Sequence, residues 1–402
     1  MVKQGYKQTE IGVIPEVWDY GVFSNFVKLR HGFQFLEHHF SSSGVPVIKI
    51  GTLKDSGGID VNKFTFVSED IFEKFKSIQL FKGDVVMALT GATLGKVSKV
   101  DYNERCLQNY RVGLFNGKEG VDNNFIYHIL QSFLVQKTVK ELVNSGAQPN
   151  LGKADFDKII IPLPPLAEQE AIASALSDAD AWIERLEQLI AKKRLIKQGA
   201  MQTLLTPPSH AEPVEAWEVK KLGEVFKLKQ GVQCGVENQF LNDKNGYIRF
   251  IRIVDLTQQN TEERFIKDPG VEHHITETDL FMVRYGAPGV VGFGYKGVIA
   301  NNLFRLIPKI ELLELYFKYV FDYMKSYIEE ISSSSTMAAL NFTTLNNIDL
   351  FFQKSLSEQA RIATILSDMD AELEALEQQL AKARLIKQGM MQELLTGRVR
   401  LV

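Results

Sequence analysis

Residues 166–206 read LAEQEAIASALSDADAWIERLEQLIAKKRLIKQGAMQTLLT, and residues 356–396 read LSEQARIATILSDMDAELEALEQQLAKARLIKQGMMQELLT. Aligned without a gap, the two stretches are identical at 27 of 41 positions. Self-similarity of this extent marks an internal repeat. The chain therefore carries one element twice, and the rest of the sequence is arranged around the two copies.

Each copy predicts a long α-helix. Its residues are mostly Ala, Leu, Glu, Gln, Lys and Arg, which favour helices, and its interior lacks proline. We expect the first helix to end before Pro207 and Pro208 and the second before Gly397. Apolar residues recur at alternating steps of four and three, which is the seam of a coiled coil. They are Ile172, Leu176, Ala179, Ile183, Leu186 and Ile190 in the first copy and Ile362, Leu366, Met369, Leu373, Leu376 and Leu380 in the second.

Each seam needs a partner, and the other copy is the nearest apolar stripe of matching length. We expect the two helices to form an antiparallel coiled coil within one chain, with a parallel homodimer as the alternative. A helix of 40 residues is about 60 Å long. We interpret the basic residues near the end of each copy as a solvated face, with phosphate contact or partner docking as the alternative. These residues are Lys192, Lys193, Arg194, Lys197, Lys382, Arg384 and Lys387.

Two unlike segments lie outside the repeat. They predict a mixed α/β (α+β) fold used twice, with domains at residues 1–160 and 207–350 and the long helices within 161–206 and 351–402. Short β-rich runs such as VPVIKI (45–50) alternate with glycine-bearing turns. The two segments share landmarks in the same order. These are KLRHGFQ (28–34) with KLKQGVQ (227–233), DVVMALTGA (84–92) with DLFMVRYGA (279–287), and LQNYR (107–111) with NNLFR (301–305).

Composition leaves the function open but excludes some classes. Hydrophobic residues make up 45% of the 402 residues and charged residues 24%, as in globular proteins. No apolar run is long enough for a signal peptide or a membrane span, so we expect a cytoplasmic protein without membrane contact. Cys106 and Cys234 fit no ligand spacing and are interpreted as reduced thiols. The net charge of −3 argues against coating DNA by bulk charge, but not against reading DNA through a few loops.

Motifs that would indicate an enzyme are missing. The run GATLGK (91–96) is one residue short of a phosphate-binding loop, and Val97 stands where Ser or Thr would hold magnesium. The adjacent pairs His38–His39 and His273–His274 lack the spacing of helical metal ligands. We find no Asn-Pro-Pro-aromatic or Asp-Pro-Pro-aromatic motif of adenine methyltransferases. We therefore expect a non-catalytic protein that binds no metal.

The whole arrangement resembles the specificity subunit of Type I restriction-modification systems. The resemblance rests on two diverged domains that each lead into L-x-E-Q and a nearly identical helix ending in LIKQG and LLT, and it covers essentially the whole chain. It implies that each domain reads one half of a bipartite sequence in double-stranded DNA. It also implies that the paired helices set the unread gap and dock two methylation subunits.

The same resemblance assigns cofactors to partners. S-adenosylmethionine belongs to the methylation subunits, ATP and Mg to restriction subunits that join them, and no cofactor to this chain. The alternatives are a fused nuclease or methyltransferase, a structural coiled-coil adaptor, and the specificity part of a related restriction-modification system that lacks a separate nuclease.

Candidate DNA-reading residues are polar side chains at the shared landmarks and in the loops before the last strand of each domain. In the first domain they are Arg30, His31, Gln34, Thr90, Thr93, Lys96, Gln108, Asn109, Arg111, Gln148 and Asn150. In the second they are Lys229, Gln230, Gln233, Arg284, Tyr285, Asn301, Asn302, Arg305, Ser334, Thr336 and Asn341.

Overall fold

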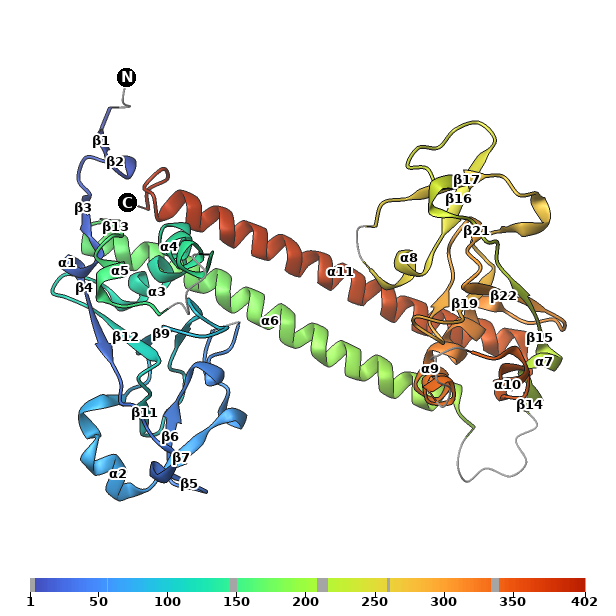
Figure 1. The fold of residues 1–402 in the computed structure, drawn as a ribbon, viewed down its shortest axis with the longest axis horizontal. Coiled ribbons are helices and arrows are strands. Elements are labelled where there is room, and N and C mark those ends of the chain that lie inside the picture. The colour runs from blue at the N-terminus through green and yellow to red at the C-terminus, as the bar shows by residue number, and fades with distance from the viewer. Residues whose placement is uncertain are drawn as a thin grey trace. The chain divides into compact units, whose positions relative to one another are not determined.

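The computed structural model describes residues 4–55, 57–144, 150–207, 216–258, 261–333 and 340–401. The chain divides into two compact units, one combining Met1–Gln188 with Gln378–Val402 and the other comprising Leu189–Glu377. Each unit holds one α/β domain and part of both long helices (Figure 1). We call residues 6–163 the first domain and residues 217–353 the second domain. No helix in the described ranges is long and apolar enough to cross a membrane.

The first domain is built on a four-stranded antiparallel sheet in the order β10–β9–β12–β4. Its strands are β10 (Val97–Lys99), β9 (Val85–Ala88), β12 (Val112–Gly117) and β4 (Val27–His31). Strand β9 reads VVMA, and all four residues are buried because both faces of the sheet are covered. Val85 and Met87 pack into the core with helices α3 (Asn123–Gln131) and α4 (Phe133–Asn144), whereas Val86 and Ala88 belong to a core on the opposite face.

A second sheet, in the order β5–β7–β6–β11–β8, completes this domain, and β11 runs parallel to β6 within it. Its strands are β5 (Phe40–Ser41), β7 (Thr65–Val67), β6 (Val45–Ile48), β11 (Cys106–Gln108) and β8 (Gln79–Leu80). The ribbon of β3 with β13 leads into the first long helix. The remaining elements are β1 (Tyr6–Thr9), β2 (Gly12–Pro15), β3 (Asp19–Val22), α1 (Phe23–Phe26), η1 (Glu37–His39), η2 (Ile50–Thr52), η3 (Val61–Lys63), α2 (Glu69–Lys74), η4 (Lys76–Ile78), α5 (Lys153–Phe156) and β13 (Ile160–Leu163).

The second domain repeats this plan with sheets in the orders β15–β22–β19–β20 and β17–β16–β21–β18. The first sheet contains β15 (Phe226–Gln230), β22 (Leu303–Pro308), β19 (Leu280–Val283) and β20 (Val291–Gly292). The second contains β17 (Arg264–Lys267), β16 (Tyr247–Ile251), β21 (Gly297–Ile299) and β18 (His274–Ile275). The remaining elements are β14 (Trp217–Lys221), α7 (Leu222–Val225), η5 (Val236–Asn238), α8 (Ile253–Thr257), η6 (Val271–His273), α9 (Glu314–Ser333), α10 (Phe342–Asn346) and β23 (Asp349–Gln353).

The predicted use of one mixed α/β fold twice is therefore confirmed, and a close backbone approach explains one shared landmark. A Cβ atom on Gly32 would lie 2.1 Å from the carbonyl oxygen of Gln108, and one on Gly231 would lie 2.3 Å from that of Ala300. Only glycine permits this approach of the first sheet to the second. The landmarks KLRHGFQ and KLKQGVQ are thus structurally equivalent.

The sequence alignment of LQNYR (107–111) with NNLFR (301–305) is wrong by three residues. Leu89 N donates to Arg111 O, and the equivalent Arg284 N donates to Asn302 O. Arg111 therefore corresponds to Asn302, and Tyr110 to Asn301. Arg305 instead lies inside strand β22, opposite Lys229. The shared arginine misled the alignment because it stands before a strand in one domain and within the strand in the other.

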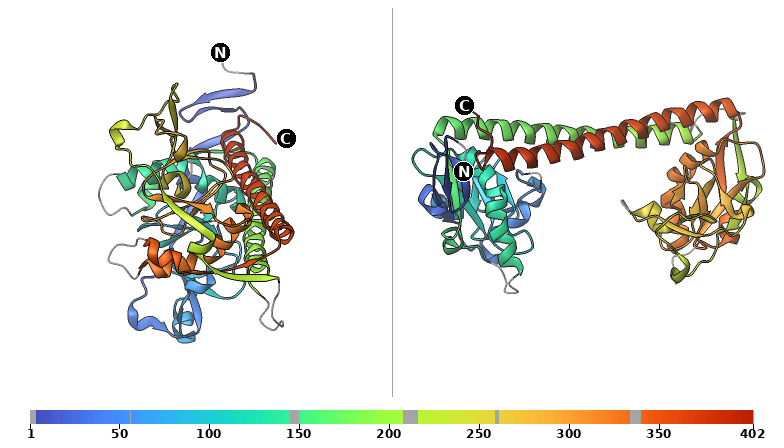
Figure 2. Two further views of the ribbon diagram at one scale, coloured as in Figure 1. Left: turned by 90° about the vertical axis from the view of Figure 1, so that its right-hand side faces the viewer. Right: turned by 90° about the horizontal axis from the view of Figure 1, so that it is seen from above.

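The long helices are α6 (Leu166–Leu205) and α11 (Leu356–Leu394), as predicted. In each unit the start of one helix lies beside the end of the other and runs in the opposite direction (Figures 1 and 2). The beginning of each seam is buried in a domain core: Ile172 and Leu176 in the first, Ile362 and Leu366 in the second. The domains thus cover the seam where each helix starts.

Ion pairs between the helices repeat in both units. Lys387 Nζ lies 2.5 Å from Asp180 Oδ1, and the equivalent Lys197 pairs with Asp370. Farther along, the Arg384–Glu187 and Arg194–Glu377 pairs each have a separation of 2.6 Å, and Lys193 adds a pair with Glu372. These basic residues therefore connect the two helices. The predicted solvated face is wrong for Lys197 and Lys387, which are largely buried, whereas Arg194 and Arg384 are solvated and paired at once.

The glutamine of L-x-E-Q fastens each helix to its domain. Gln169 Oε1 accepts from Asp122 N at 2.9 Å, and Gln359 Oε1 accepts from Leu313 N at 2.9 Å. Both side chains are buried, and each amide nitrogen donates to a backbone carbonyl just before its helix. The motif therefore recurs because the same contact between helix and domain forms in both units.

A second contact between each domain and its long helix differs between the units. Six residues after Asp122 and Leu313 lie His128 and Tyr319, which occupy equivalent places. Tyr319 donates from its hydroxyl to Asp370 Oδ2 at 2.8 Å, whereas His128 Nε2 lies 3.1 Å from Ser177 Oγ. Burial, with Lys387 and Lys99 nearby, lowers the pKa of His128 to about 3. The histidine therefore stays neutral in the fold at pH values where it is protonated in the unfolded chain.

Removing Lys387 should destabilise the fold more than removing Arg384. The Lys387 side chain is only 15% exposed and also donates to Gln131 Oε1 at 3.0 Å, so Lys387→Met leaves Asp180 without its cation. We expect a loss of roughly 1.5–3 kcal/mol, against less than about 1 kcal/mol for Arg384→Met at an exposed pair. Urea unfolding of the full chain measures both, and Lys197→Met against Arg194→Met is the matched repeat. Equal losses within each pair would contradict this ranking.

Stability should fall below pH 6.5, and His128 should contribute to the fall. The unfolded chain protonates this histidine near pH 6.5 but the folded chain only near pH 3, so acid favours unfolding between these values. Between pH 6.5 and 4.5 we expect His128→Tyr, which introduces the residue of the second unit, to reduce the loss by roughly 2 kcal/mol. The comparison uses urea unfolding of both proteins at the two pH values. Parallel losses would show that His128 does not remain neutral.

Candidate nucleic-acid interface

One edge of the first sheet gathers several loops of the first domain. Strand β4 ends at His31, Thr90 follows β9, and Tyr110 and Arg111 precede β12. Asn150 forms an isolated β-bridge with Thr90. Together with Leu151 and Gly152, these residues line a hollow of about 420 Å³. The structure thus brings together four predicted residues: His31, Thr90, Arg111 and Asn150.

The hollow carries the groups that base edges require. Arg111 is exposed, its Nε donates to the Tyr110 hydroxyl at 2.8 Å, and its guanidinium lies 5.3 Å from the Tyr110 ring centroid. The other polar lining groups are an imidazole, a hydroxyl and an amide, and no carboxylate is among the described lining residues. Donors and acceptors without negative charge suit nucleobases in the major groove.

Three predicted residues of this domain lie behind the hollow. Arg30 donates to Gln108 Oε1 at 3.0 Å and to the carbonyls of Ser77 and Gln79. Gln108 is fully buried and also donates to Val112 O, and the buried Asn109 accepts from Arg111 N. Their interpretation as surface readers is corrected, because their polar groups are satisfied inside the domain.

The remaining candidates of the first domain lie elsewhere. Lys96 Nζ is 2.6 Å from Asp55 Oδ1, and a hydrogen bond from Lys96 lowers the pKa of that carboxyl. Lys96 lines a different cavity, shared with Asp180 and Arg384 of the long helices. The hydroxyl of Thr93 is buried without a partner among the described residues, and Gln34 is exposed. Gln148 lies outside the described residues.

In the second domain, Gln230, Tyr285, Asn301 and Asn302 occupy the equivalent edge. Gln230 Nε2 donates to Asn301 O at 2.8 Å, and Tyr285 is 40% exposed. Asn341, in the loop beside them, caps α10 by accepting from Thr343 N. This edge therefore carries side chains different from those of the first domain.

Other candidates of the second domain stabilise its structure. Arg284 donates to Leu340 O and lies 4.9 Å from the Phe342 ring. Arg305 donates to Asp279 Oδ1 at 2.5 Å and Lys229 to Glu272 O. These hydrogen bonds hold loops in place, and the assignment of Arg284, Arg305 and Lys229 as base readers stays a prediction. Gln233 is exposed, and Ser334 and Thr336 lie outside the described residues.

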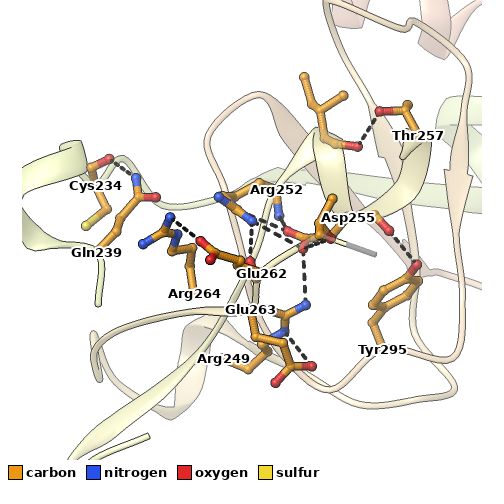
Figure 3. A network of polar contacts seen from close by, with 12 residues as sticks. Cys234, Gln239, Arg249, Arg252, Asp255, Thr257, Glu262, Glu263, Arg264 and Tyr295 are labelled. Atoms are coloured by element: carbon orange, nitrogen blue, oxygen red, sulfur yellow. Dashed lines mark hydrogen bonds and ion pairs between the residues drawn. The ribbon is translucent and has the colours of Figure 1, made fainter. Parts of the chain in front are cut away.

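The second domain has its own hollow, of about 560 Å³. Figure 3 labels four of its lining residues, Cys234, Gln239, Arg252 and Arg264. It is lined by Cys234, Val236, Gln239, Phe250, Arg252, Ile253, Val254, Arg264, Ala300, Asn301 and Asn302. Sequence reasoning missed Gln239, Arg252 and Arg264. A usable signal was present for Arg252, since this residue follows the buried end of YIRFI as Lys49 follows VPVI. Among the described residues, no cluster of His, Cys, Asp and Glu could hold a metal ion.

Comparison with known proteins identifies the family. The family description "Type I restriction modification DNA specificity domain" matches residues 15–193 and 214–383. The putative type I restriction enzyme MjaX specificity subunit of Methanocaldococcus jannaschii is 25% identical over 99% of this chain and 97% of its own length. The MjaVIII specificity subunit of the same organism is 31% identical, over about half of each chain.

Solved structures share the fold. The Type-I restriction-modification S subunit from M. genitalium matches with a TM-score of 0.65 and 17% identity, covering 94% of this chain and 96% of that one. A chain from a study of complex assembly and conformational transition of the type I R-M system matches with a TM-score of 0.57 and 17% identity, covering 96% and 99%. The chain therefore belongs to the family of Type I restriction-modification DNA specificity subunits, and it contains two recognition domains.

Proposed function

We propose that each recognition domain reads one half of a bipartite DNA sequence through its hollow and through the loops at the edge of its first sheet. One observation carries the proposal: the first sheets of the two domains have the same strand order but present different side chains at the same edge, namely His31, Thr90 and Arg111 in the first domain and Gln230, Tyr285 and Asn302 in the second. A shared scaffold with different contact groups suits the reading of two different half-sites. The paired helices α6 and α11 set the number of unread bases between them.

The chain supplies recognition, and its partners supply the chemistry. S-adenosylmethionine binds to methylation subunits and ATP with Mg to restriction subunits, while this chain acts without a cofactor. The ion pairs Asp180–Lys387 and Asp370–Lys197 join structural elements of the protein, which supports a non-catalytic role. Methyl transfer by the purified chain alone would contradict this part of the proposal.

An exposed apolar pair on each long helix supports docking of two methylation subunits. Leu195 and Ile196 on α6 are 68% and 44% exposed, and the equivalent Leu385 and Ile386 on α11 are 67% and 43% exposed. Both pairs stand in the identical sequence RLIKQG. Because one binding sequence occurs twice, it suits two copies of one partner, with a large apolar side chain at the centre of each contact.

Exchanging the second domain should change one half of the recognised sequence. We expect a chain whose residues 207–350 come from another member of the family, assembled with methylation subunits, to methylate a sequence with one old and one new half. The reason is that each domain reads DNA through its own loops. Methylome sequencing of cells carrying either chain is the measurement, and the wild-type chain is the control. A change in both halves would show a single composite site.

Replacing the exposed leucines Leu195 and Leu385 with glutamate should abolish the binding of one methylation subunit per substitution. We expect Leu385→Glu to leave one bound subunit and Leu195→Glu with Leu385→Glu to leave none, since losing a central apolar contact costs at least ~2 kcal/mol, about 30-fold in Kd. Native mass spectrometry counts the subunits. The matched control is Lys192→Glu with Lys382→Glu, at equivalent exposed positions of both copies. Two subunits retained by the double leucine variant would refute this docking surface.

A further inference from the structure

Two arginines, Arg252 and Arg264, line the hollow of the second domain. Arg252 follows strand β16, Arg264 begins β17, and Asn301 and Asn302 form the turn before β22. All four line the same hollow with Gln239. No carboxylate is among the described residues that line it, so a ligand would meet mainly hydrogen-bond donors.

A buried carboxylate behind the hollow holds Arg252 in place (Figure 3). Asp255, whose side chain is 1% exposed, accepts from Arg252 N at 2.7 Å and Arg252 Nε at 3.2 Å. Its Oδ1 also accepts from Arg249 Nη2 and the Thr261 hydroxyl. Burial opposes its charge, but the hydrogen bonds from Arg252 and the charge of Arg249 keep the pKa of Asp255 below its ordinary value. The carboxylate therefore fixes the direction of the Arg252 guanidinium.

Each arginine keeps donors for a ligand. Arg252 Nη2 donates to Glu262 O at 2.8 Å, and among the described residues its Nη1 has no hydrogen-bond acceptor. Arg264 Nη2 pairs with Glu262 Oε2 at 3.1 Å, and its side chain is 28% exposed. Both guanidinium groups are thus held at one end by the protein while retaining N–H groups that can be donated elsewhere.

The hollow also offers an acceptor. Gln239 Nε2 donates to Cys234 O at 3.1 Å, which leaves the Gln239 side-chain oxygen to accept from a ligand. Asn302 Oδ1, in contrast, is buried without a hydrogen-bond partner among the described residues and is closed to a ligand. A ligand that satisfies this site must therefore offer acceptors to the arginines and an N–H group to an amide oxygen.

The equivalent positions of the first domain lack this arrangement. Lys49 replaces Arg252, and the hydroxyl of Thr52, which accepts from Lys49 N at 3.2 Å, takes the place of the Asp255 carboxylate. Arg111 and Tyr110 replace Asn302 and Asn301. The guanidinium held by a carboxylate is therefore a property of the second domain and not of the shared fold.

We propose that the hollow of the second domain reads the major-groove edge of a G·C base pair. Arg252 and Arg264 donate to O6 and N7 of guanine, and the side-chain oxygen of Gln239 accepts from the N4 amine of cytosine. This is the pattern of acceptors and donor that a G·C pair presents in the major groove. Asp255 acts as a positioning residue. The inference rests on the proposed function, because it assumes that this domain meets DNA.

The test is methylome sequencing of cells in which the chain is assembled with its methylation subunits. The exchange of residues 207–350 first identifies the half-site that belongs to the second domain. We expect that half-site to contain a G·C pair. Arg252→Gln or Arg264→Ala should reduce the methylation of sites that contain this pair roughly 10-fold to 100-fold relative to sites with another base pair at the same position. The motif should become degenerate at that position alone, and the half-site of the first domain should stay unchanged.

Lys267→Gln is the matched control. Lys267 is an exposed basic residue on the same strand as Arg264, β17, but it does not line the hollow. It should leave the motif intact, whereas Asp255→Asn should relax the same position as Arg252→Gln. Thermal unfolding of each variant separates loss of folding from loss of reading, and Arg264→Ala, which removes a partly exposed side chain, keeps the test valid if Asp255→Asn does not fold.

The possible results separate the two proposals. A half-site without a G·C pair, or an unchanged motif in folded Arg252→Gln and Arg264→Ala variants, would overturn the assignment of the hollow while leaving the proposed function standing. If the exchange of residues 207–350 changes neither half-site, the proposed function itself fails.

Discussion

Each unit depends on the antiparallel contact between the start of one long helix and the end of the other. The Asp180–Lys387 and Asp370–Lys197 pairs are the same contact made twice, because the two helices carry nearly the same sequence. An antiparallel pair of identical sequences places every contact in two copies. The same type of ion pair therefore forms once in each unit, and a substitution in one helix has an equivalent position in the other.

The helix starts connect this contact to the domains. Gln169 and Gln359 bind the backbone before α3 and α9, and Ile172 and Ile362 belong to the domain cores. Each recognition domain is consequently fixed to a helix by buried contacts, while polar side chains of its loops at the sheet edge, such as Arg111 and Tyr285, are exposed. The loops can therefore differ between the domains without loss of the fold.

Elements with strong periodicity were predictable from the sequence. The helices α6 and α11 follow from the heptad spacing, and the equivalence of Gly32 and Gly231 follows from matching landmarks whose backbone approach requires glycine. The site was predicted only in part. His31, Thr90, Arg111 and Asn150 come together, because loops at neighbouring strand ends meet at one edge.

The sequence does not show whether a polar side chain is exposed. Arg30 and Gln108 satisfy each other inside the first domain, although they stand in landmarks rich in DNA-reading residue types. Arg252 was missed for the converse reason: its run YIRFIRI has the pattern of a buried strand, and its role depends on Asp255 and Glu262, whose contacts are tertiary. Hydrogen-bond partners distant in sequence therefore decide which polar residues remain available to a ligand.

Intramolecular ion pairs also affect how a chain of net charge −3 can bind DNA. Many basic side chains are already paired: Lys193, Arg194 and Lys197 with the other helix, and Arg305 with Asp279. Phosphate contacts supply most of the salt-dependent affinity for DNA, whereas base contacts supply the discrimination. A protein in which many cations stabilise its own fold is therefore better suited to discrimination than to affinity.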